Sequence, residues 1–475
     1  MKYRTFLVIG LMGIGFAWSA SAGNPQRVGH TTFLPRHSSP DDKGMYAATI
    51  DPTNGYAYFV GNYLTKVDIT VDPPQPIGTA LNSGQFASSA VDLAAGYYYL
   101  SRSTLVRCAL GTGTNPVTAA GSLPLTAGSA QEVVVDDSDP DPNNHYAYVL
   151  CAVSGAPAKI AKVALSTFTE LNSVSLSAGE TNFTLGCVAD PKNGYAYFVN
   201  IPDANSAPVV VKIKMMPGTN PPVRVGALSF GGIGEFIDGG CIDTVHGYAY
   251  YGNYNSDTNV IAKVYKVKLE NGDVPPTLVG FASLRAGEGR LAAGVADPQN
   301  GFVYFGNDNS YPGGIYQLSM NGTNPPLEIT FLPFPGGPET PPPSGMTTNN
   351  ITTHVDGILP FGEVFFRSAV IDPLRGYAYF GQDSRPNQIV KVKLAQVDPL
   401  TLTGAQIQTN GSFQFGFTNI YGAAFRVFTA TNLTLPLSNW GVSSNPVVEV
   451  SPGQYQFTDS PPATNPLQFY RVETP

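Results

Sequence analysis

The sequence predicts an all-β protein, a seven-bladed β-propeller followed by a small β-sandwich. Two observations lead to this prediction. The tetrapeptide Gly-Tyr-Ala-Tyr, or a close variant, occurs seven times, usually a few residues after an Asp-Pro pair. Each copy belongs to a unit in which apolar and polar residues alternate in short stretches. Four such antiparallel strands per unit is the composition of a propeller blade. The copies begin at Gly55, Gly96, His145, Gly194, Gly247, Gly301 and Gly376.

The composition agrees with this class. Gly (51) and Pro (41) are abundant, and charged residues make up only 13% of the chain. This mixture suits short strands joined by tight turns rather than long helices. The net charge is −8 and there is no basic cluster. The charge argues against nucleic acid and anionic membrane surfaces as partners.

The first 22 residues have the pattern of an export signal. Lys2 and Arg4 give a basic start, residues 6–18 are apolar, and residues 20–22 (Ala-Ser-Ala) form a small-x-small cleavage site. The alternative is a membrane anchor, but the apolar run is short for a membrane span. We therefore expect a mature chain that starts at Gly23 and has no membrane span. It should be secreted, extracellular or on the cell surface, with the periplasm as an alternative.

The first repeat, residues 45–81, shows what one unit builds. Residues 45–50 and 56–60 read as two strands joined by a turn from Asp51 to Gly55. In that turn Asp can accept backbone N–H groups, Pro fixes φ, and Gly takes the left-handed conformation. A third strand with a Lys-Val pattern and a short fourth strand follow. The repeat Asp falls at Asp51, Asp92, Asp141, Asp190, Asp243, Asp297 and Asp372.

The two ends of the repeat region predict how the ring closes. Residues 27–33 are similar to the fourth strand of other repeats, whereas the seventh repeat has three clear strands and ends near Leu394. The N-terminal strand can therefore complete the seventh blade and leave no open edge. The paired tyrosines of each repeat share one face of their strand, so we expect them to pack between blades.

The repeat resembles the Asp-Pro-x-x-Gly-Tyr-Ala-Tyr-Phe-Gly repeats of secreted and cell-surface β-propeller proteins, and more loosely the YVTN-type propellers. The resemblance covers residues 27–396. It implies the fold and leaves the function open, because such propellers carry many activities.

After Asp398 the repeat stops, and six short alternating stretches predict the β-sandwich. Residues 431–440 and the closing Phe-Tyr-Arg-Val resemble a fibronectin-like C-terminal module of large bacterial secreted proteins. The resemblance implies an accessory role. We expect Trp440 in its core, with a sugar-stacking platform as the alternative. The expected parts are a signal peptide (1–22), the propeller (23–398) and the sandwich (399–475).

The sequence carries no familiar catalytic motif. It has no Gly-x-Ser-x-Gly elbow and no phosphate-binding loop, and its five histidines lie at no metal-ligand spacing. The four cysteines show no Cys-x-x-Cys spacing, and we expect buried thiols rather than a disulfide between Cys187 and Cys241. The remaining cysteines are Cys108 and Cys151.

One set of carboxylates could crowd the mouth of the central channel, because its members precede the inner strands. Mutual repulsion there would be relieved by solvent or by a bound cation, for which Ca²⁺ is the candidate. A solvated acidic rim is the alternative, and we favour it. The candidates are Glu132, Glu180, Glu235, Glu288 and Glu363, with Asp41 and Asp42 in the first repeat and Gln85 in the second.

The loops between second and third strands should open on the same end of the ring. They combine amide, carboxylate and aromatic groups, a mixture that suits glycans but is also ordinary loop composition. A Pro-rich insertion at residues 333–361 should lie there as a decoration or a lid. The candidate ligand-binding residues are Asn253, Tyr254, Asn307, Asp308, Tyr311, Asp383 and Arg385, with the basic Arg290 and Arg367 nearby.

These observations leave three functional hypotheses. The first, which we favour, is a non-catalytic extracellular binding or scaffold protein whose propeller face contacts protein or carbohydrate. The second is a propeller enzyme, a polysaccharide lyase or glycoside hydrolase, with its site at the channel mouth. The third is a purely structural surface protein.

Overall fold

A computed structural model describes the chain from Asn24 to Glu473 with gaps. The described residues are 24–32, 44–61, 63–80, 88–181, 186–200, 207–231, 236–254, 261–284, 290–308, 313–334, 365–383, 388–395, 402–418, 425–432, 439–451, 453–460 and 468–473. The expected signal peptide and residues 335–361 of the Pro-rich insertion lie outside them. Among the helices of the described part, none is long and apolar enough to cross a membrane.

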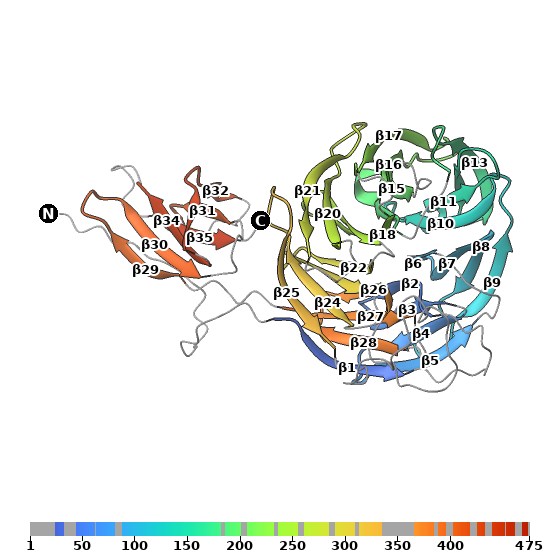
Figure 1. The fold of residues 1–475 in the computed structure, drawn as a ribbon, viewed down its shortest axis with the longest axis horizontal. Helices are drawn as coiled ribbons and strands as arrows, with labels where there is room; N and C mark the ends of the chain where they lie inside the picture. The colour runs from blue at the N-terminus through green and yellow to red at the C-terminus, as the bar shows by residue number, and fades with distance from the viewer. Residues whose placement is uncertain are drawn as a thin grey trace, which may run out of the picture.

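Seven four-stranded antiparallel sheets follow one another between Gln26 and Lys393 (Figure 1). The first holds β2 (Ala47–Asp51), β3 (Tyr56–Val60), β4 (Leu64–Asp68) and β5 (Gln75–Ala80). The second holds β6 (Ser88–Asp92), β7 (Tyr97–Arg102), β8 (Thr104–Ala109) and β9 (Thr118–Leu123). The third holds β10 (Ser129–Asp136), β11 (Tyr146–Ala152), β12 (Lys159–Ala164) and β13 (Thr169–Ser175). The fourth holds β14 (Val188–Asp190), β15 (Tyr195–Asn200), β16 (Val209–Lys214) and β17 (Val223–Ser229).

The remaining sheets repeat this order. The fifth holds β18 (Phe236–Asp243), β19 (Tyr248–Tyr254), β20 (Lys263–Lys268) and β21 (Thr277–Ser283). The sixth holds β22 (Leu291–Asp297), β23 (Phe302–Asn307), β24 (Gly314–Ser319) and β25 (Leu327–Pro333). The seventh holds β26 (Phe366–Asp372), β27 (Tyr377–Gln382), β28 (Gln388–Lys393) and the N-terminal β1 (Gln26–Thr32). Two short 3₁₀ helices, η1 (Pro142–Asn144) and η2 (Pro191–Asn193), lie in hairpin turns.

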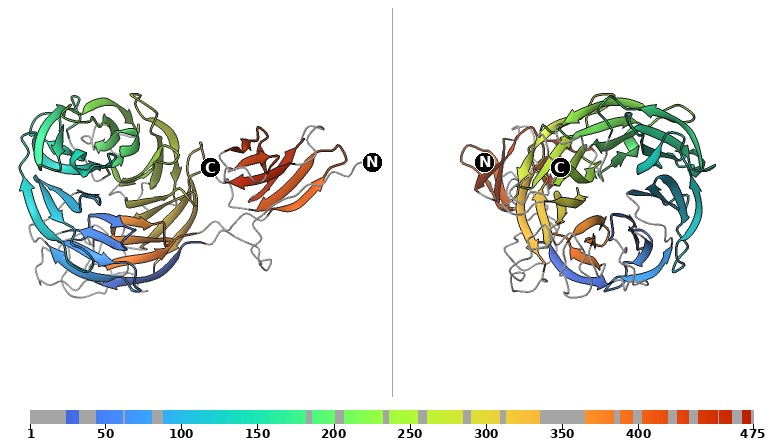
Figure 2. Two further views of the ribbon diagram at one scale, coloured as in Figure 1. Left: turned by 180° about the vertical axis from the view of Figure 1, so that it is seen from behind. Right: turned by 45° about the vertical axis from the view of Figure 1, so that its right-hand side comes forward.

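The sheets form a closed ring with the first strand of each sheet innermost (Figures 1 and 2). Each inner strand contacts the inner strand of the next sheet, and β26 contacts β2. The seventh sheet is completed by β1, which pairs with β28 from Gln26 opposite Lys393 to Thr32 opposite Gln388. The N-terminal strand therefore covers the edge of β28, as the sequence predicts.

The Asp of each repeat caps the hairpin between the first two strands. Asp51 accepts the backbone N–H of Asn54 at 3.0 Å, and Gly55 adopts a φ of 75°. The third sheet differs from the others. Asp141 caps its turn by accepting the backbone N–H of Asn143 at 3.0 Å, but Asp136, rather than Asp141, pairs with the first repeat tyrosine, because the turn there is longer. The cap recurs at Asp92, Asp190, Asp243, Asp297 and Asp372.

The repeat tyrosines do pack between sheets, and they also hold a buried cation. The rings of Tyr58 and Tyr98, from the first and second sheets, lie 5.6 Å apart. Lys212 on β16 is fully buried, with its Nζ 4.1 Å from the centre of the Tyr195 ring. The same Nζ donates to carbonyl oxygens in the next sheet's turn, at 2.7 Å to Glu270. Lys66, Lys162 and Lys266 repeat this arrangement.

The cysteines bear out the expectation of free thiols. All four are free, and Cys108, Cys151 and Cys241 are buried in hydrophobic clusters. Cys187 is partly buried, and its Sγ lies 3.6 Å from the Ser88 Oγ. Burial raises the pKa of each thiol.

The tail forms two further sheets that lie outside the ring (Figures 1 and 2). One holds β29 (Thr403–Ile407), β30 (Phe413–Thr418), β34 (Gln454–Asp459) and β33 (Val447–Ser451). The other holds β32 (Gly441–Val442), β31 (Arg426–Ala430) and β35 (Phe469–Glu473). The sheets share an aromatic core that includes Phe415, Phe457 and Tyr470. Trp440 is half-buried beside β32 rather than fully within that core.

Candidate binding face at the mouth of the ring

The candidate residues gather at one end of the ring. Each inner strand starts at this end, and each second strand finishes there, so the loops predicted to bind ligand share it. We call it the mouth end. The other end carries the Asp-capped hairpins and the turns between third and fourth strands, and we call it the turn end. On β18, Asp238 and Asp243 are five residues apart, which places them roughly 17 Å apart along the strand.

A cavity of about 130 Å³ lies between the inner strands. Most of its wall is made by Gly, Ala and Ser residues, and the larger side chains in it are Tyr46, Cys187 and Arg367. Gly239 shows why small residues are needed. Its φ is 68°, and a Cβ there would lie 2.4 Å from the carbonyl oxygen of Ala292 on the next inner strand. A cavity of this size holds a small number of water molecules.

Arg367 is the centre of a charge network at the mouth. Its guanidinium lies 2.9 Å from an Asp308 carboxylate oxygen, 3.6 Å from Asp238 and 3.8 Å from Asp383. The three carboxylates come from the fifth, sixth and seventh sheets, so one cation links three neighbouring sheets. Asp308 is almost fully buried, whereas the side chains of Arg367 and Asp383 remain 18% and 16% exposed. The network therefore presents the positive charge of Arg367 and the negative charge of Asp383 at the surface.

Tyr46 extends this network to the first sheet. Its ring centre is 5.8 Å from the Arg367 guanidinium carbon, and its hydroxyl is hydrogen bonded to Asp383. The same Asp383 accepts the backbone N–H of Gly44 at 2.9 Å. Burial, and then the charge of Asp383, raises the pKa of Tyr46, so the phenol stays neutral and can donate. Asp383 thus ties the seventh sheet to the segment before β2.

Two carboxyl groups near the ring axis are protonated more readily than usual. Glu132 on β10 is buried, and one oxygen accepts the backbone N–H of Gly186 at 2.9 Å. In the described part of the chain, its other oxygen has no hydrogen-bond partner. Burial raises the pKa of Glu132 to about 8. Burial also raises the pKa of Asp238 to about 7, although Arg367 opposes this shift.

The second described member of the predicted Glu set has a different role. Glu180 receives two hydrogen bonds from the Arg224 guanidinium, at 2.6 and 2.9 Å, and the backbone N–H of Ser177 at 2.7 Å. It therefore clamps its own loop to β17. Six other candidates, Glu235, Glu288, Glu363, Asp41, Asp42 and Gln85, lie outside the described residues.

The described residues offer a poor fit for Ca²⁺. Among them, no group of three or more His, Cys, Asp or Glu side chains is arranged to hold a metal ion. The largest group of carboxylates at the mouth already surrounds the Arg367 guanidinium, which takes the place of a cation. The Ca²⁺ site at the full Glu set stays a prediction.

Two of the other predicted loop residues, both asparagines, brace their own loops. Asn253 accepts the backbone N–H of Lys263 at 2.7 Å, and Asn307 accepts that of Gly314 at 3.0 Å, so both brace the base of their loop. The Arg290 carbonyl accepts the backbone N–H of Asp308 at 2.8 Å. Tyr254 ends β19 opposite Phe236. Tyr311 and Arg385 lie outside the described residues.

The structure thus brings together three predicted residues, Arg367, Asp308 and Asp383. It adds Asp238 and Tyr46, which the sequence analysis missed. A signal for Asp238 was available, since a charged residue inside a buried, glycine-rich inner strand breaks the repeat pattern. Tyr46 gave no comparable signal, because tyrosine is common throughout the repeats.

No known protein family matches this chain in sequence, and no curated protein matches it. Solved structures do resemble it in fold. Hydrazine synthase from Kuenenia stuttgartiensis aligns with a TM-score of 0.52 at 12% identity, over 75% of this chain and 98% of that chain. U3-55K aligns with a TM-score of 0.49 at 8% identity, over 78% of this chain and 99% of that chain. The WD40 β-propeller domain of Doa1 aligns with a TM-score of 0.48 at 8% identity, over 78% of this chain and 96% of that chain. The chain is an all-β protein whose repeated four-stranded sheets share the fold of β-propeller proteins.

Proposed function

We propose that this chain is a non-catalytic extracellular binding or scaffold protein that contacts protein or glycan through the mouth end of a seven-bladed propeller. Residues 1–22 would direct export and residues 23–398 would form the propeller. Residues 399–475 would form a fibronectin-like β-sandwich that spaces or tethers the ring. The part of the proposal that concerns export rests on the sequence of the first 22 residues.

The observation that carries the binding proposal is the network around Arg367. It fixes a guanidinium, three carboxylates and a phenol on four neighbouring sheets, so little side-chain freedom is left to lose when a ligand binds. Arg367 and Asp383 remain partly exposed. Such pre-ordered polar groups beside an aromatic ring suit the hydroxyl groups of a glycan or the backbone and side chains of a protein loop.

The same geometry argues against catalysis by these groups. Asp308 and Asp383 are engaged by Arg367, Tyr46 and backbone N–H groups, so neither is placed as a solvent-facing nucleophile. The Cys187 thiol is kept protonated, because burial raises its pKa well above the usual range. A protonated thiol is a poor nucleophile.

The second candidate function, a polysaccharide lyase or glycoside hydrolase, is favoured by one observation. With pKa values of about 8 and about 7, Glu132 and Asp238 hold protons near neutral pH, as a general acid must. Against it, both side chains are almost fully buried, at 1% and 6% exposure.

A glycan array and protein capture with the mature protein test the binding proposal. We expect Asp383→Asn to weaken binding of a hit roughly tenfold, because the substitution removes a mouth-end charge. Val245→Ser, at a 72% exposed position of the turn end, is the matched control and should leave binding unchanged. Thermal unfolding of both variants checks that they fold.

Several outcomes would count against the proposal. Equal losses for both variants, or loss only for Val245→Ser, would place the binding site elsewhere. Release of shortened or unsaturated products from a bound glycan would favour the enzyme. The absence of any glycan or protein hit would favour a purely structural role.

A further inference from the structure

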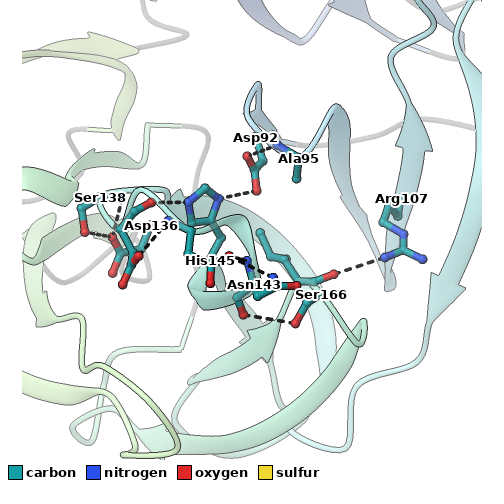
Figure 3. Close-up of polar contacts among 11 residues, drawn as sticks. Asp92, Ala95, Arg107, Asp136, Ser138, Asn143, His145 and Ser166 are labelled. Carbon is teal, nitrogen blue, oxygen red and sulfur yellow. Dashed lines mark hydrogen bonds and ion pairs between the residues drawn. The ribbon is translucent and has the colours of Figure 1, made fainter.

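His145 joins the second and third sheets at the turn end (Figure 3). Its Nδ1 lies 2.7 Å from a carboxylate oxygen of Asp92, at the end of β6. Its Nε2 lies 2.6 Å from the backbone carbonyl oxygen of Asp139, in its own loop. The side chains of His145 and Asp92 are 1% and 0% exposed, so water does not compete for these contacts.

Both partners of the ring are acceptors. A neutral imidazole has one N–H donor and one acceptor nitrogen, whereas the protonated ring has two donors. A carboxylate and a carbonyl at hydrogen-bond distance from the two nitrogens therefore require the doubly protonated, cationic ring. Asp92 supplies the opposite charge, and it is itself held by the backbone N–H of Ala95 at 2.9 Å.

The loop that carries His145 is an enlarged version of the repeat turn. From Asp136 to Tyr146 it spans ten positions, against five from Asp51 to Tyr56 in the first sheet. His145 stands where most repeats have Gly. The loop is fastened to its own sheet as well, since the His145 carbonyl accepts the backbone N–H of Leu165 at 3.1 Å. The Ser166 hydroxyl donates to the carbonyl of Asn143 at 3.2 Å (Figure 3).

The charges that surround His145 are mostly negative. Asp92 faces it from the second sheet. Arg107 lies nearby on β8 and donates to the Leu165 carbonyl at 3.2 Å. Burial alone lowers the pKa of His145, but the hydrogen bonds to Asp92 and to the Asp139 carbonyl outweigh it, and the pKa is raised above its usual value of 6.5. The carboxylates on its own loop and strand are Asp136, Asp137, Asp139 and Asp141.

We propose that His145 is a proton-dependent latch that fastens the acidic loop 137–144 to the second sheet, and that loss of its proton in alkaline solution releases this loop. A neutral ring can keep only one of the two hydrogen bonds and leaves the Asp92 charge uncompensated. Because the folded protein binds this proton more tightly than the unfolded chain, the contribution of the latch is complete below pH 6.5. It is lost as the pH rises through the higher pKa of the folded state.

Amide hydrogen exchange of peptides that cover residues 137–144 tests the latch. Between pH 6 and pH 9.5, after correction for the intrinsic pH dependence, we expect exchange in the wild-type loop to become at least roughly tenfold faster. His145→Gln should show fast exchange at every pH. His246→Gln is the matched control, because the His246 Nδ1 bonds to Asp243 of its own turn at 2.8 Å and the ring is 23% exposed.

A nitrogen NMR spectrum of the histidine rings supplies a readout that does not depend on the variant folding. At pH 6.5 the His145 ring, assigned by its loss in His145→Gln or by its contacts in the wild type, should have two protonated nitrogens. Exchange that does not change with pH, or a neutral ring at pH 6, would overturn the proposal.

Discussion

Lys266 on β20 donates a hydrogen bond from its Nζ to the backbone carbonyl oxygen of Met320, in the turn of the next sheet, at 2.6 Å. The same ammonium donates to Gly322 and, at 3.2 Å, to Asn324, and it lies 4.1 Å from the centre of the Tyr248 ring. It is fully buried. One lysine therefore satisfies several carbonyls of the neighbouring sheet, and the first repeat tyrosine covers its charge. The same contact at Lys66, Lys162 and Lys212 means that four pairs of neighbouring sheets are joined in this way.

Replacing Lys266 by Met should lower the free energy of unfolding by about 2–4 kcal/mol, because buried carbonyls of the neighbouring turn lose their donor. Lys268→Met, two residues along the same strand, is the control. Lys268 is 51% exposed and pairs with Glu270, so its loss should have a much smaller effect on stability. Urea unfolding of the two variants measures the difference. Equal losses of stability in the two variants would show that the hydrogen bonds of the buried lysine do not stabilise the fold.

A glycine stands opposite three of these lysines, Lys66, Lys212 and Lys266, and leaves room for a proline of the next sheet's turn. Gly226 pairs with Lys212, and a Cβ added to it would lie 2.6 Å from Pro275. Gly226→Ala should therefore destabilise the protein by about 1–3 kcal/mol. Gly29 pairs with Lys391 in the same way, but its Cβ would meet nothing within 4 Å. Gly29→Ala should stay within about 0.5 kcal/mol of the wild type in thermal or urea unfolding. A larger loss of stability for Gly29→Ala than for Gly226→Ala would refute the steric explanation.

The pH dependence of stability should reveal the buried carboxyl groups near the ring axis. The folded-state pKa values of Glu132 and Asp238 are raised to about 8 and about 7, so the folded protein binds more protons than the unfolded chain. Their contribution is complete below the unfolded pKa values, near pH 4, and is lost as the pH rises through about 7 to 8. Urea midpoints should therefore fall between pH 5 and pH 8.5.

Glu132→Gln should remove a large part of this decrease, because the amide does not titrate. Asp273→Asn serves as the control, since Asp273 is an exposed carboxylate whose pKa is lowered by its hydrogen bond with Lys214. A Glu132→Gln protein with the same pH slope as the wild type would show that Glu132 does not carry a raised pKa.

The sequence predicted the parts of the fold that depend on neighbours along the chain. Asp51 and Gly55 form one hairpin, so their spacing was sufficient to predict the cap and the left-handed glycine. In the longer turn before His145, Asp141 still caps the turn, but the strand ends at Asp136, so the count from the tyrosine no longer gave the strand end. The closing strand was found because residues 27–33 repeat a pattern seen elsewhere.

The lysine contact was missed because its partner lies in the next repeat, more than fifty residues away in the case of Lys266 and Met320. A trace of this contact was present in the sequence, because the strand position that holds the lysine in other repeats is Gln317 in the sixth sheet. A lysine there would have no turn to contact in the seventh sheet, since β1 supplies the outer strand of that sheet. In place of that contact, the backbone N–H of Ala395 donates to the Tyr304 hydroxyl at 3.2 Å.

The candidate site was harder to predict for the same reason. Arg367 and Asp238 meet because the ring brings the fifth and seventh sheets to one axis, and no local pattern records that approach. The mouth-end loops were identified from the topology, whereas the residues that join them depend on side-chain directions at the start of several inner strands.

The central claim is that ligands bind at the mouth end of the ring. Hydrogen-exchange footprinting of the mature protein with a bound glycan or protein hit tests it most directly. We expect protection at residues 44–48, 290–293, 365–369 and 380–383, with no change at residues 51–55, 243–247 and 372–376 of the turn end. Protection confined to the turn-end residues would contradict the claim.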